Sequence, residues 1–517
     1  MKAWDKTRRN YINWVTNTDL RYEFGKKIKF EDLSLWWITK LVDRDNVNEP
    51  EWYLNLNKKL NRKESNVEKN NFSIFLLILK VIKNFSTRLI FVIFIKLFFS
   101  KRKIPNKKTT CLYALLLNFR LIGKKYVDYQ YGKFGINDSR NKVYFLDLQE
   151  NLNLFINYFN IRNNLKKIPF DYVIEQHNIS IVDLFKIYIS TIVNLILTLK
   201  ILKKKNYFFI NKINCERILK QKLIESYFGS IQDHLLKGYA LKNTLRKLSC
   251  RNFVTYFEFF PRSRSIYYFA KKAMIKNIIS IQHGHPHDNF LALNIKKNDY
   301  SKEDLNNFYS PKPDVICCQG EKYFKKMKKI FPRNKIYKVG SFKIELSKNK
   351  IKPPKKKKFK KLKQKNKILI IAGLYDWTPF VKLLNKCKLD NFDIFLCPHP
   401  VKNRCLGFFK ENFKHRFKTV NPDFHHQLTE KDYIICGESS LGIEVAIKKH
   451  NAFRVYDKEF IASFDPNQEI VTATNSNTIS NILKRRIYNN SSFLKKNYFF
   501  KYDRSASNLL EKILKKL

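Results

Sequence analysis

The sequence has few acidic residues, and it lacks several patterns that would assign it to a common class. Its 44 Asp and Glu stand against 101 Lys and Arg, which gives a formal net charge of +57 over 517 residues. Such a charge is typical of proteins that meet nucleic acid, anionic lipid or a phosphorylated substrate. Lysine is spread along nearly the whole chain with abundant Asn, Ile, Phe and Tyr, so compositional drift explains much of it. No RRM, KH or zinc pattern is present, and we expect no nucleic-acid partner.

The cysteines do not form the pattern of a disulfide framework. They are nine, an odd number, and no two are spaced as a CxxC pair. This usage predicts a reducing, cytosolic compartment. The amino terminus lacks the short apolar core and small-residue cleavage site of a secretory signal, so we expect no export.

Long uninterrupted apolar runs are also missing. The very apolar stretch 72–99 contains four basic residues, and its longest charge-free run is eight residues, Phe72 to Leu79. A spanning helix needs about 20 apolar residues. A second run, Ile187 to Leu199, has thirteen. Two interpretations fit both stretches: core helices, or amphipathic helices docked on a membrane surface. We expect a pair of amphipathic helices within 72–99.

Short apolar runs alternate with helical segments from about residue 250 onward. Alternation of this kind predicts parallel sheets covered on both faces. A Lys-rich segment with Pro353-Pro354 separates two such series and predicts a linker. The sequence therefore predicts an α/β fold of two doubly wound, Rossmann-like domains facing a cleft. The predicted strands are 253–257, 278–281, 315–318 and 336–339 before the linker, and 368–372, 394–397, 433–436 and 453–456 after it.

The predicted domain boundaries follow from these series. Residues 1–240 form an additional, mainly helical N-terminal region with amphipathic apolar segments that fit membrane docking. Residues 241–345 form the first Rossmann-like domain, and whether part of 1–240 belongs to it stays open. Residues 346–366 are the linker, 367–500 the second domain and 501–517 a C-terminal helix.

Two motifs lie at strand ends of the second domain. Cys397-Pro398-His399-Pro400 follows one apolar run, and Gly437-Glu438-Ser439-Ser440-Leu441-Gly442-Ile443-Glu444 follows another. Open α/β sheets bind ligands at the carboxyl ends of their strands. The second motif also opens a predicted helix, whose free N–H groups could hold a phosphate. Such a pocket suits a nucleotide-activated donor.

A third motif, Ser280-Ile281-Gln282-His283-Gly284, ends a predicted strand of the first domain. The order of the three motifs resembles the GT-B glycosyltransferases that build bacterial capsule and surface carbohydrate. It is also similar to the CDP-glycerol glycerophosphotransferases of teichoic acid synthesis. The resemblance covers roughly residues 250 to 475.

The resemblance implies a donor site in the second domain. His399, with Pro400, would contact the donor phosphate, and Ser439 and Ser440 would hydrogen-bond the same group. Glu444 would accept hydrogen bonds from ribose hydroxyls. Gly373 is a position of close backbone approach. Preorganised donors of this kind stabilise a leaving nucleotide without metal. A plain helix N-cap is the alternative for Ser439 and Ser440.

The first domain would hold the acceptor. His283 is the candidate general base, because an imidazole can take a proton from a hydroxyl at neutral pH. Glu258 would orient the acceptor or His283, and Arg262 and Gln282 would contact the acceptor. A structural role for His283 is the first alternative. A metal site that includes His285 and His287 is the second, but no further ligand cluster is evident, so we predict no metal.

The expected function is therefore a metal-independent glycosyltransferase without a cofactor. It would move a sugar from a nucleotide donor to a surface polysaccharide or lipid-linked precursor, and the motif pair favours CMP- or CDP-linked donors over UDP-linked ones. We expect it in the cytoplasm, in peripheral contact with the inner face of the cytoplasmic membrane. The alternatives are a teichoic-acid-type glycerophosphotransferase, a nucleotide-sugar 2-epimerase, or a basic protein that binds RNA or membrane.

Overall fold

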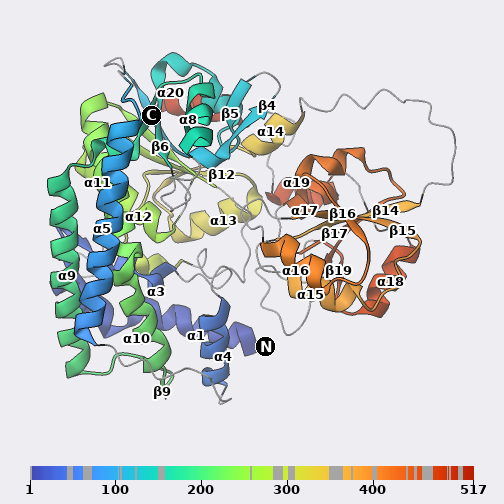
Figure 1. The fold of residues 1–517 in the computed structure, drawn as a ribbon, viewed down its shortest axis with the longest axis horizontal. Helices are drawn as coiled ribbons and strands as arrows, with labels where there is room; N and C mark the ends of the chain where they lie inside the picture. Colours follow the sequence, from blue (N-terminus) through green and yellow to red (C-terminus); the bar gives the residue numbers. More distant parts are fainter. Residues whose placement is uncertain are drawn as a thin grey trace.

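Two parallel β-sheets, each covered by helices, organise the chain (Figure 1). The structure is a computed structural model of the 517 residues. It describes residues 3–43, 50–61, 73–102, 104, 108–122, 125–148, 158–256, 259–282, 295–300, 309–348, 365–373, 377–398, 404–437, 441–447, 451–456, 470–485, 487, 489, 491–498 and 505–517.

The first sheet has seven strands in the order β13-β12-β11-β10-β3-β6-β7, and every neighbouring pair is parallel. The predicted segment 241–345 supplies four of them, and residues 110–174 supply the other three. The first domain therefore reaches far into the N-terminal half. The strands are β3 (Thr110–Leu115), β6 (Lys142–Asp147), β7 (Tyr172–Ile174), β10 (Asn252–Thr255), β11 (Asn277–Ile281), β12 (Val315–Cys318) and β13 (Lys335–Lys338).

Both faces of this sheet are buried, as a parallel sheet requires. Alternate residues of β3 enter different cores: Cys111 and Tyr113 pack on one side, Leu112 and Ala114 on the other. The first side is covered by the helical N-terminal region, and the second by residues 91–99, the shorter segments 131–134, 165–170 and 342, and the C-terminal helix at 506–510. Near-continuous apolar strands result, which explains why period-2 alternation is weak in the sequence.

The second sheet has six parallel strands in the order β16-β15-β14-β17-β18-β19. Two cores again fill its two faces. The predicted fold class, α/β with two Rossmann-like domains and a helical N-terminal region, is confirmed. The strands are β14 (Asn366–Ile371), β15 (Phe392–Cys397), β16 (Phe417–Thr419), β17 (Tyr433–Cys436), β18 (Asn451–Val455) and β19 (Thr472–Ala473).

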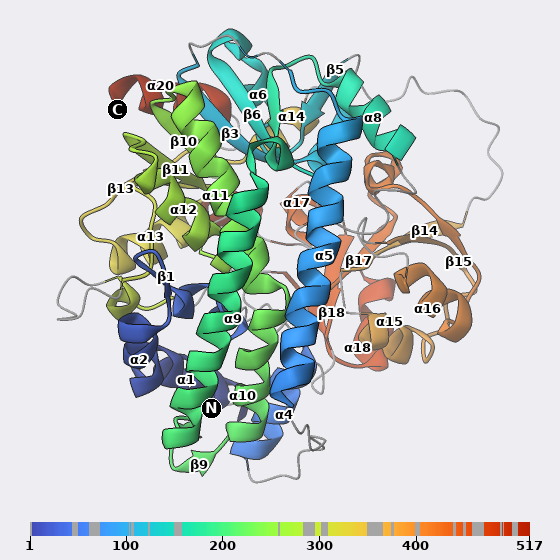
Figure 2. The ribbon, with the colours of Figure 1, turned by 60° about the vertical axis from the view of Figure 1, so that its left-hand side comes forward.

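The helical region contains two long neighbours, α5 (Ile74–Phe98) and α9 (Ile181–Lys204), which lie side by side (Figure 2). The Phe85 ring lies 4.9 Å from the rings of both Phe185 and Tyr188. The expectation of two helices within 72–99 is wrong: α5 is continuous, because no Gly or Pro interrupts it. The other helices before β10 are α1 (Ala3–Asn17), α2 (Asp19–Lys27), α3 (Lys40–Asp43), α4 (Pro50–Leu60), α6 (Lys133–Ile136), α8 (Tyr158–Lys167), α10 (Glu216–Glu225) and α11 (Ser230–Leu248).

The C-terminal segment returns to the first domain. A Cβ at Gly320 would lie 2.1 Å from the Asn497 carbonyl oxygen, so the backbones meet there without a side chain between them. The Glu345 carboxylate accepts hydrogen bonds from the Ser507 N–H (3.0 Å) and from the hydroxyls of Ser505 and Ser507. The later helices are α12 (Pro261–Lys272), α13 (Glu321–Ile330), α14 (Phe342–Lys348), α15 (Trp377–Leu384), α16 (Arg404–Asn412), α17 (Leu441–Ile447), α18 (Ser476–Lys484), α19 (Ser491–Tyr498) and α20 (Ala506–Lys516).

Two of the sequence predictions, the linker and the cleft, involve residues that are largely outside the described ranges. Most of the predicted linker, 349–364, lies outside the described residues. Several of the loops expected to border the cleft lie outside them as well, so the cleft stays a prediction.

Candidate functional site

Three strands of the second sheet end in one row. Ile371 at the end of β14 pairs with Cys397 of β15 on one side and with Cys436 of β17 on the other. The chain runs from β14 outward to β15 and β16, and then returns to β17 on the opposite side. The strand order therefore reverses between β14 and β17. Doubly wound folds bind ligands outside the carboxyl ends of the strands at such a switch point.

The predicted donor residues all follow these three strand ends. Gly373 is buried, and its carbonyl accepts a hydrogen bond from the Trp377 indole N–H (3.1 Å). Glu444 is partly exposed on α17. His399, Pro400, Ser439 and Ser440 lie outside the described residues, but the described strands place their attachment points at the same edge.

Close packing of α17 on β17 depends on Gly442. A Cβ at this position would lie 2.5 Å from the Cys436 Sγ atom and 3.0 Å from its Cβ atom. Sequence reasoning quoted Gly442 as part of the motif but gave it no role. A glycine in the first turn of the helix that follows a strand is the signal, since it lets helix and strand approach closely.

The first sheet also reverses, between β3 and β10. Gln282 directly follows β11 at this carboxyl edge and is 2% exposed. Its side-chain oxygen accepts a hydrogen bond from the Gln319 backbone N–H (2.7 Å), and the Gln319 amide donates to the Gln282 carbonyl (2.9 Å). This pair fixes where the chain leaves β11 for His283. His283 and Glu258 lie outside the described residues, and the acceptor role of Gln282 stays a prediction.

Arg262, the other predicted acceptor contact, belongs to a buried charge cluster. Its guanidinium lies 3.5 Å from the Asp147 carboxylate and 3.8 Å from that of Asp233. Lys237 forms shorter contacts with the same acids, 2.6 Å to Asp147 and 3.6 Å to Asp233. The side chain of Arg262 is 24% exposed, while its guanidinium is held by the carboxylates of Asp147 and Asp233.

Asp147, the last residue of β6, is the centre of this charge cluster. It is fully buried and also accepts a hydrogen bond from the Tyr113 hydroxyl (2.7 Å). Burial opposes its ionisation, but the charges of Lys237 and Arg262 outweigh burial and keep its pKa below the ordinary value. Arg88 of α5 contacts Asp233 at 3.4 Å, so the cluster ties α5 to the sheet edge.

Glu175 lies beside the cluster, one residue after β7. It is fully buried, and neither carboxylate oxygen has a hydrogen-bond partner among the residues that the structure describes. Burial, together with the nearby negative charge of Asp147, raises its pKa to about 8. Glu175 is therefore protonated and uncharged at neutral pH.

Sequence reasoning missed the partners of Arg262. Two signals were available: Asp147 ends an apolar run, and Asp233 precedes Lys237 by four residues on one helix face. Neither signal says that the two elements meet. Within the described ranges, no three His, Cys, Asp or Glu side chains come together as a metal site.

Two of the cavities that described residues line, one in each sheet's domain, lie away from the switch points. One of about 730 Å³ borders the amino-terminal ends of β15 and β16, opposite the predicted donor edge. The other, of about 580 Å³, lies beside the edge strand β7. The larger one is therefore separate from the predicted donor site.

Replacing Gly442 by alanine tests the packing of the donor edge. We expect Gly442→Ala to destabilise the protein by roughly 1–3 kcal/mol, because the new methyl group overlaps Cys436. Chemical denaturation measures the loss. Gly407→Ala is the matched control, since it lies in helix α16 with nothing within 4 Å of its Cβ position. Equal stability of the two variants would contradict the close approach.

The buried Glu175 carboxyl makes stability depend on pH. The unfolded side chain ionises near pH 4.5 whereas the folded one keeps its proton to about pH 8, so folding becomes less favourable as pH rises through this window. Glu175→Gln mimics the protonated acid, so the stability of this variant should not fall as pH rises. Near pH 8 the variant should be more stable than the native protein by a free energy of unfolding on the order of a few kcal/mol. Denaturation on both sides of the window measures it, with the exposed Glu411→Gln as control. A gain independent of pH would rule out the protonated carboxyl.

Comparisons with known proteins give matches in structure alone. No protein-family model matches the chain, and no curated protein matches it in sequence. Among solved structures, the chain is similar to Staphylococcus aureus MnaA with UDP, with 10% sequence identity and a TM-score of 0.43. The match covers 79% of this chain and 96% of the MnaA chain. It is also similar to a UDP-GlcNAc 2-epimerase from Neisseria meningitidis bound to UDP-GlcNAc, with 12% sequence identity and a TM-score of 0.41. That match covers 80% of this chain and 100% of the epimerase chain.

A third similar structure is the wall teichoic acid polymerase TagF, with 13% identity, a TM-score of 0.41, and coverage of 86% of this chain and 98% of that one. All three identities are below 25% and all three TM-scores are below 0.5. We therefore base the function proposed below on the residues and strand register of this chain.

Proposed function

We propose that this protein is a GT-B glycosyltransferase that moves a sugar from a nucleotide-activated donor to a surface polysaccharide or its lipid-linked precursor. One observation carries the proposal: β14, β15 and β17 end in one row at the switch point of the second sheet. The three motif segments that follow them are thereby joined to one edge.

The donor would lie across this edge. His399, Ser439 and Ser440 carry the ring nitrogen and hydroxyls that hydrogen-bond a phosphate, and each follows a strand of the row. Glu444 lies on α17, where a carboxylate accepts hydrogen bonds from ribose hydroxyls. As the nucleotide leaves, its phosphate gains negative charge, and preorganised donors stabilise that charge. We propose that these protein groups act without a metal ion.

The acceptor would lie at the carboxyl edge of the first sheet. His283 follows Gln282, whose side chain is fixed by Gln319 at the end of β12. In the proposed reaction, His283 removes the proton of an acceptor hydroxyl, and the acceptor oxygen bonds to the sugar carbon as the bond to the nucleotide phosphate breaks. Arg262 would contact an anionic group of the acceptor. The compartment that fits is the cytoplasm, at the inner face of the membrane.

Nucleotide binding by the full-length protein tests the donor site. A thermal-shift screen against CMP, CDP, UDP, GDP and ADP, with their sugar and glycerol conjugates, should show a rise in melting temperature for one base. A ligand at 100 times its Kd adds about 2.7 kcal/mol of stability. His399→Ala and Ser440→Ala should abolish the rise because each removes a phosphate contact.

The matched control is His415→Ala, in the same domain but just before β16, at the opposite edge of the sheet. It should keep the nucleotide response. Retained binding in His399→Ala and Ser440→Ala would refute the donor site. A response to CDP-glycerol alone would favour a glycerophosphotransferase, and sugar isomerisation without acceptor would favour an epimerase.

A further inference from the structure

The exposed large apolar side chains of this protein gather on two helices. Of the 20 that the described residues expose, nine lie on α5 and five on α9. The two helices are neighbours, so these side chains form one surface on the outer side of the first domain (Figure 2). We call it the α5–α9 face. Contiguous apolar surface of this kind marks an interaction site.

The spacing of these side chains is helical. On α9 they recur every three or four residues, and on α5 they do so within 75–82 and 90–97, with the exposed Ser86 between these two groups. Other side chains of each helix are buried against the domain. Each helix thus has an apolar stripe on its outer side as well as an inner one. The outer stripes are Phe75, Leu79, Ile82, Ile90, Ile93 and Leu97 on α5, and Val182, Phe185, Ile189 and Val193 on α9.

Polar contacts hold α9 along the domain. By length and composition α9 could cross a membrane, and it is the one helix of the described chain that could. Its inner side, however, hydrogen-bonds the rest of the protein: the Asn194 amide donates to the Lys29 carbonyl (3.1 Å), and the Thr198 hydroxyl lies 2.6 Å from that of Tyr227. Both side chains are buried. These contacts keep α9 along the domain, with its apolar stripe on the outer side. A partner would therefore bind that stripe without α9 leaving the domain.

The charges of the two helices identify that partner as anionic. Together α5 and α9 contain eight Lys and Arg and a single acid, Asp183, and two of the eight, Arg88 and Lys186, pair with acids outside the two helices. Asp183 is used in the capping box of α9. Exposed Lys80, Lys83 and Lys96 flank the α5 stripe, where long side chains can lie along apolar surface and keep the ammonium in the polar layer. A second copy of this face would instead bring lysines against lysines.

A basic cavity continues the face where the two helices meet. The cavity of about 580 Å³ is lined by Ser100 just after α5 and by Asn178 just before α9. His177 joins the two segments, with Nε2 3.0 Å from the Phe99 carbonyl oxygen. The cavity thus opens beside the end of the apolar stripes.

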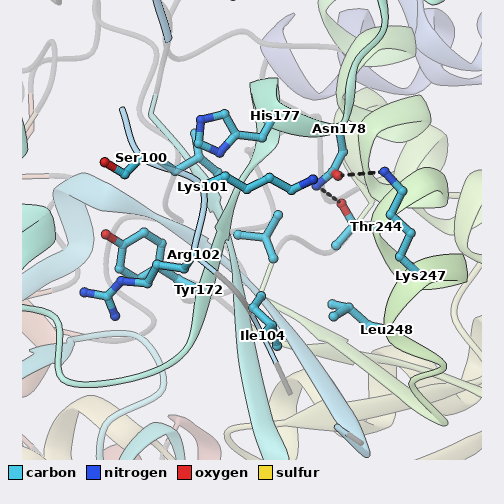
Figure 3. A pocket seen from close by; sticks show the side chains of 12 residues that line it. Ser100, Lys101, Arg102, Ile104, Tyr172, His177, Asn178, Thr244, Lys247 and Leu248 are labelled. Carbon is cyan, nitrogen blue, oxygen red and sulfur yellow. Dashed lines mark hydrogen bonds between the residues drawn. The ribbon is translucent and has the colours of Figure 1, made fainter. Parts of the chain in front are cut away.

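Lysines line the polar side of this cavity, and apolar groups line the other (Figure 3). In the view shown, Lys101 and Lys247 both point toward Asn178, and the Lys247 ammonium donates to the Asn178 side-chain oxygen (3.4 Å). Burial lowers the pKa of Lys96 on α5, and the charges of Lys101 and Lys247 lower it further, although Asp183 opposes them. The cavity is therefore electrostatically continuous with the lysines of the face.

We propose that the α5–α9 face docks on a bilayer of anionic phospholipid, and that the cavity binds the phosphate headgroup of one lipid through Lys101 and Lys247. The apolar stripes would enter the acyl boundary while the flanking lysines meet the headgroups, as amphipathic surface helices do. The α5–α9 face is separate from the proposed transferase site, and the membrane proposal does not depend on that site.

Sedimentation with vesicles tests the face, using full-length protein without nucleotide. The protein should bind phosphatidylcholine vesicles that contain phosphatidylglycerol more tightly than pure phosphatidylcholine. Ile90→Glu and Ile189→Glu should each weaken binding by at least about tenfold, because each removes a buried aliphatic side chain from the contact. Met274→Glu, an exposed apolar residue distant in sequence from both helices, is the matched control and should bind as the native protein does.

Charge-removing variants test the cavity. The double variant Lys101→Gln, Lys247→Gln should lose roughly 30-fold in affinity for the anionic vesicles, since each lysine near such a surface strengthens binding about fivefold. Lys512→Gln, Lys515→Gln removes the same charge from exposed positions of α20 and should lose far less.

Three results would overturn the proposal. The first is vesicle binding that the stripe variants leave unchanged. The second is a native dimer, seen by analytical ultracentrifugation, that Ile90→Glu dissociates while no vesicle binds, which would assign the face to a second copy. The third is stabilisation by inorganic phosphate, lost in the double lysine variant, without any vesicle binding, which would assign the cavity to a soluble anion.

Discussion

The parallel pairing of β3 with β10 is the contact on which the rest of this structure depends. It joins Thr110–Leu112 to Asn252–Val254 across 142 positions of the chain. Because of it, strands from the N-terminal half and strands from the middle form one sheet. The same pairing sets the switch point of the first domain. It also brings Asp147 of β6 and Arg262 of α12 to a common edge, since both elements follow the two paired strands.

A parallel sheet must be covered on both faces, and this requirement explains the helical region. One face of the first sheet packs on a core that includes α9, α10, α11 and α12, with part of α5. The helices α5 and α9 are the outer layer of this cover. Their inner sides pack on the rest of the cover, α9 on α11 and α5 on α9, so their outer apolar stripes are left over from the packing of the domain. The membrane proposal follows from this surplus of apolar surface together with its lysine border.

The buried charges at the first sheet edge show how the domain holds an arginine in place. Two carboxylates, Asp147 and Asp233, are shared between Lys237 and Arg262, and Arg88 adds a third cation from α5. Burying such a group stabilises little by itself, because desolvation opposes the attraction. Its effect is on geometry: the two carboxylates orient the guanidinium of Arg262. Glu175 avoids a further buried charge by keeping its proton.

Much of the fold could be predicted from the sequence because its signals are local. The runs at 315–318 and 433–436 coincide with β12 and β17, and the order of runs and helices predicts two parallel sheets. The motif segments could be placed at strand ends for the same reason. The three strands within 110–174 could not be assigned to the first sheet, since nothing in that segment indicates that its first strand, β3, pairs with β10. The continuity of α5 was also misjudged, although it lacks Gly and Pro.

The sequence by itself determined which segments become strands and helices, and which of them end in polar motifs, because propensity and apolar periodicity act over a few residues. Tertiary structure decided which strand ends share a row, which charges meet at Asp147, and which side of α5 and α9 faces outward. Those outcomes depend on pairings between residues that lie from 26 positions apart, as for Ile371 and Cys397, to 142 positions apart, as for Thr110 and Asn252. No local pattern encodes such pairings, because they are selected by the burial of whole sheet faces.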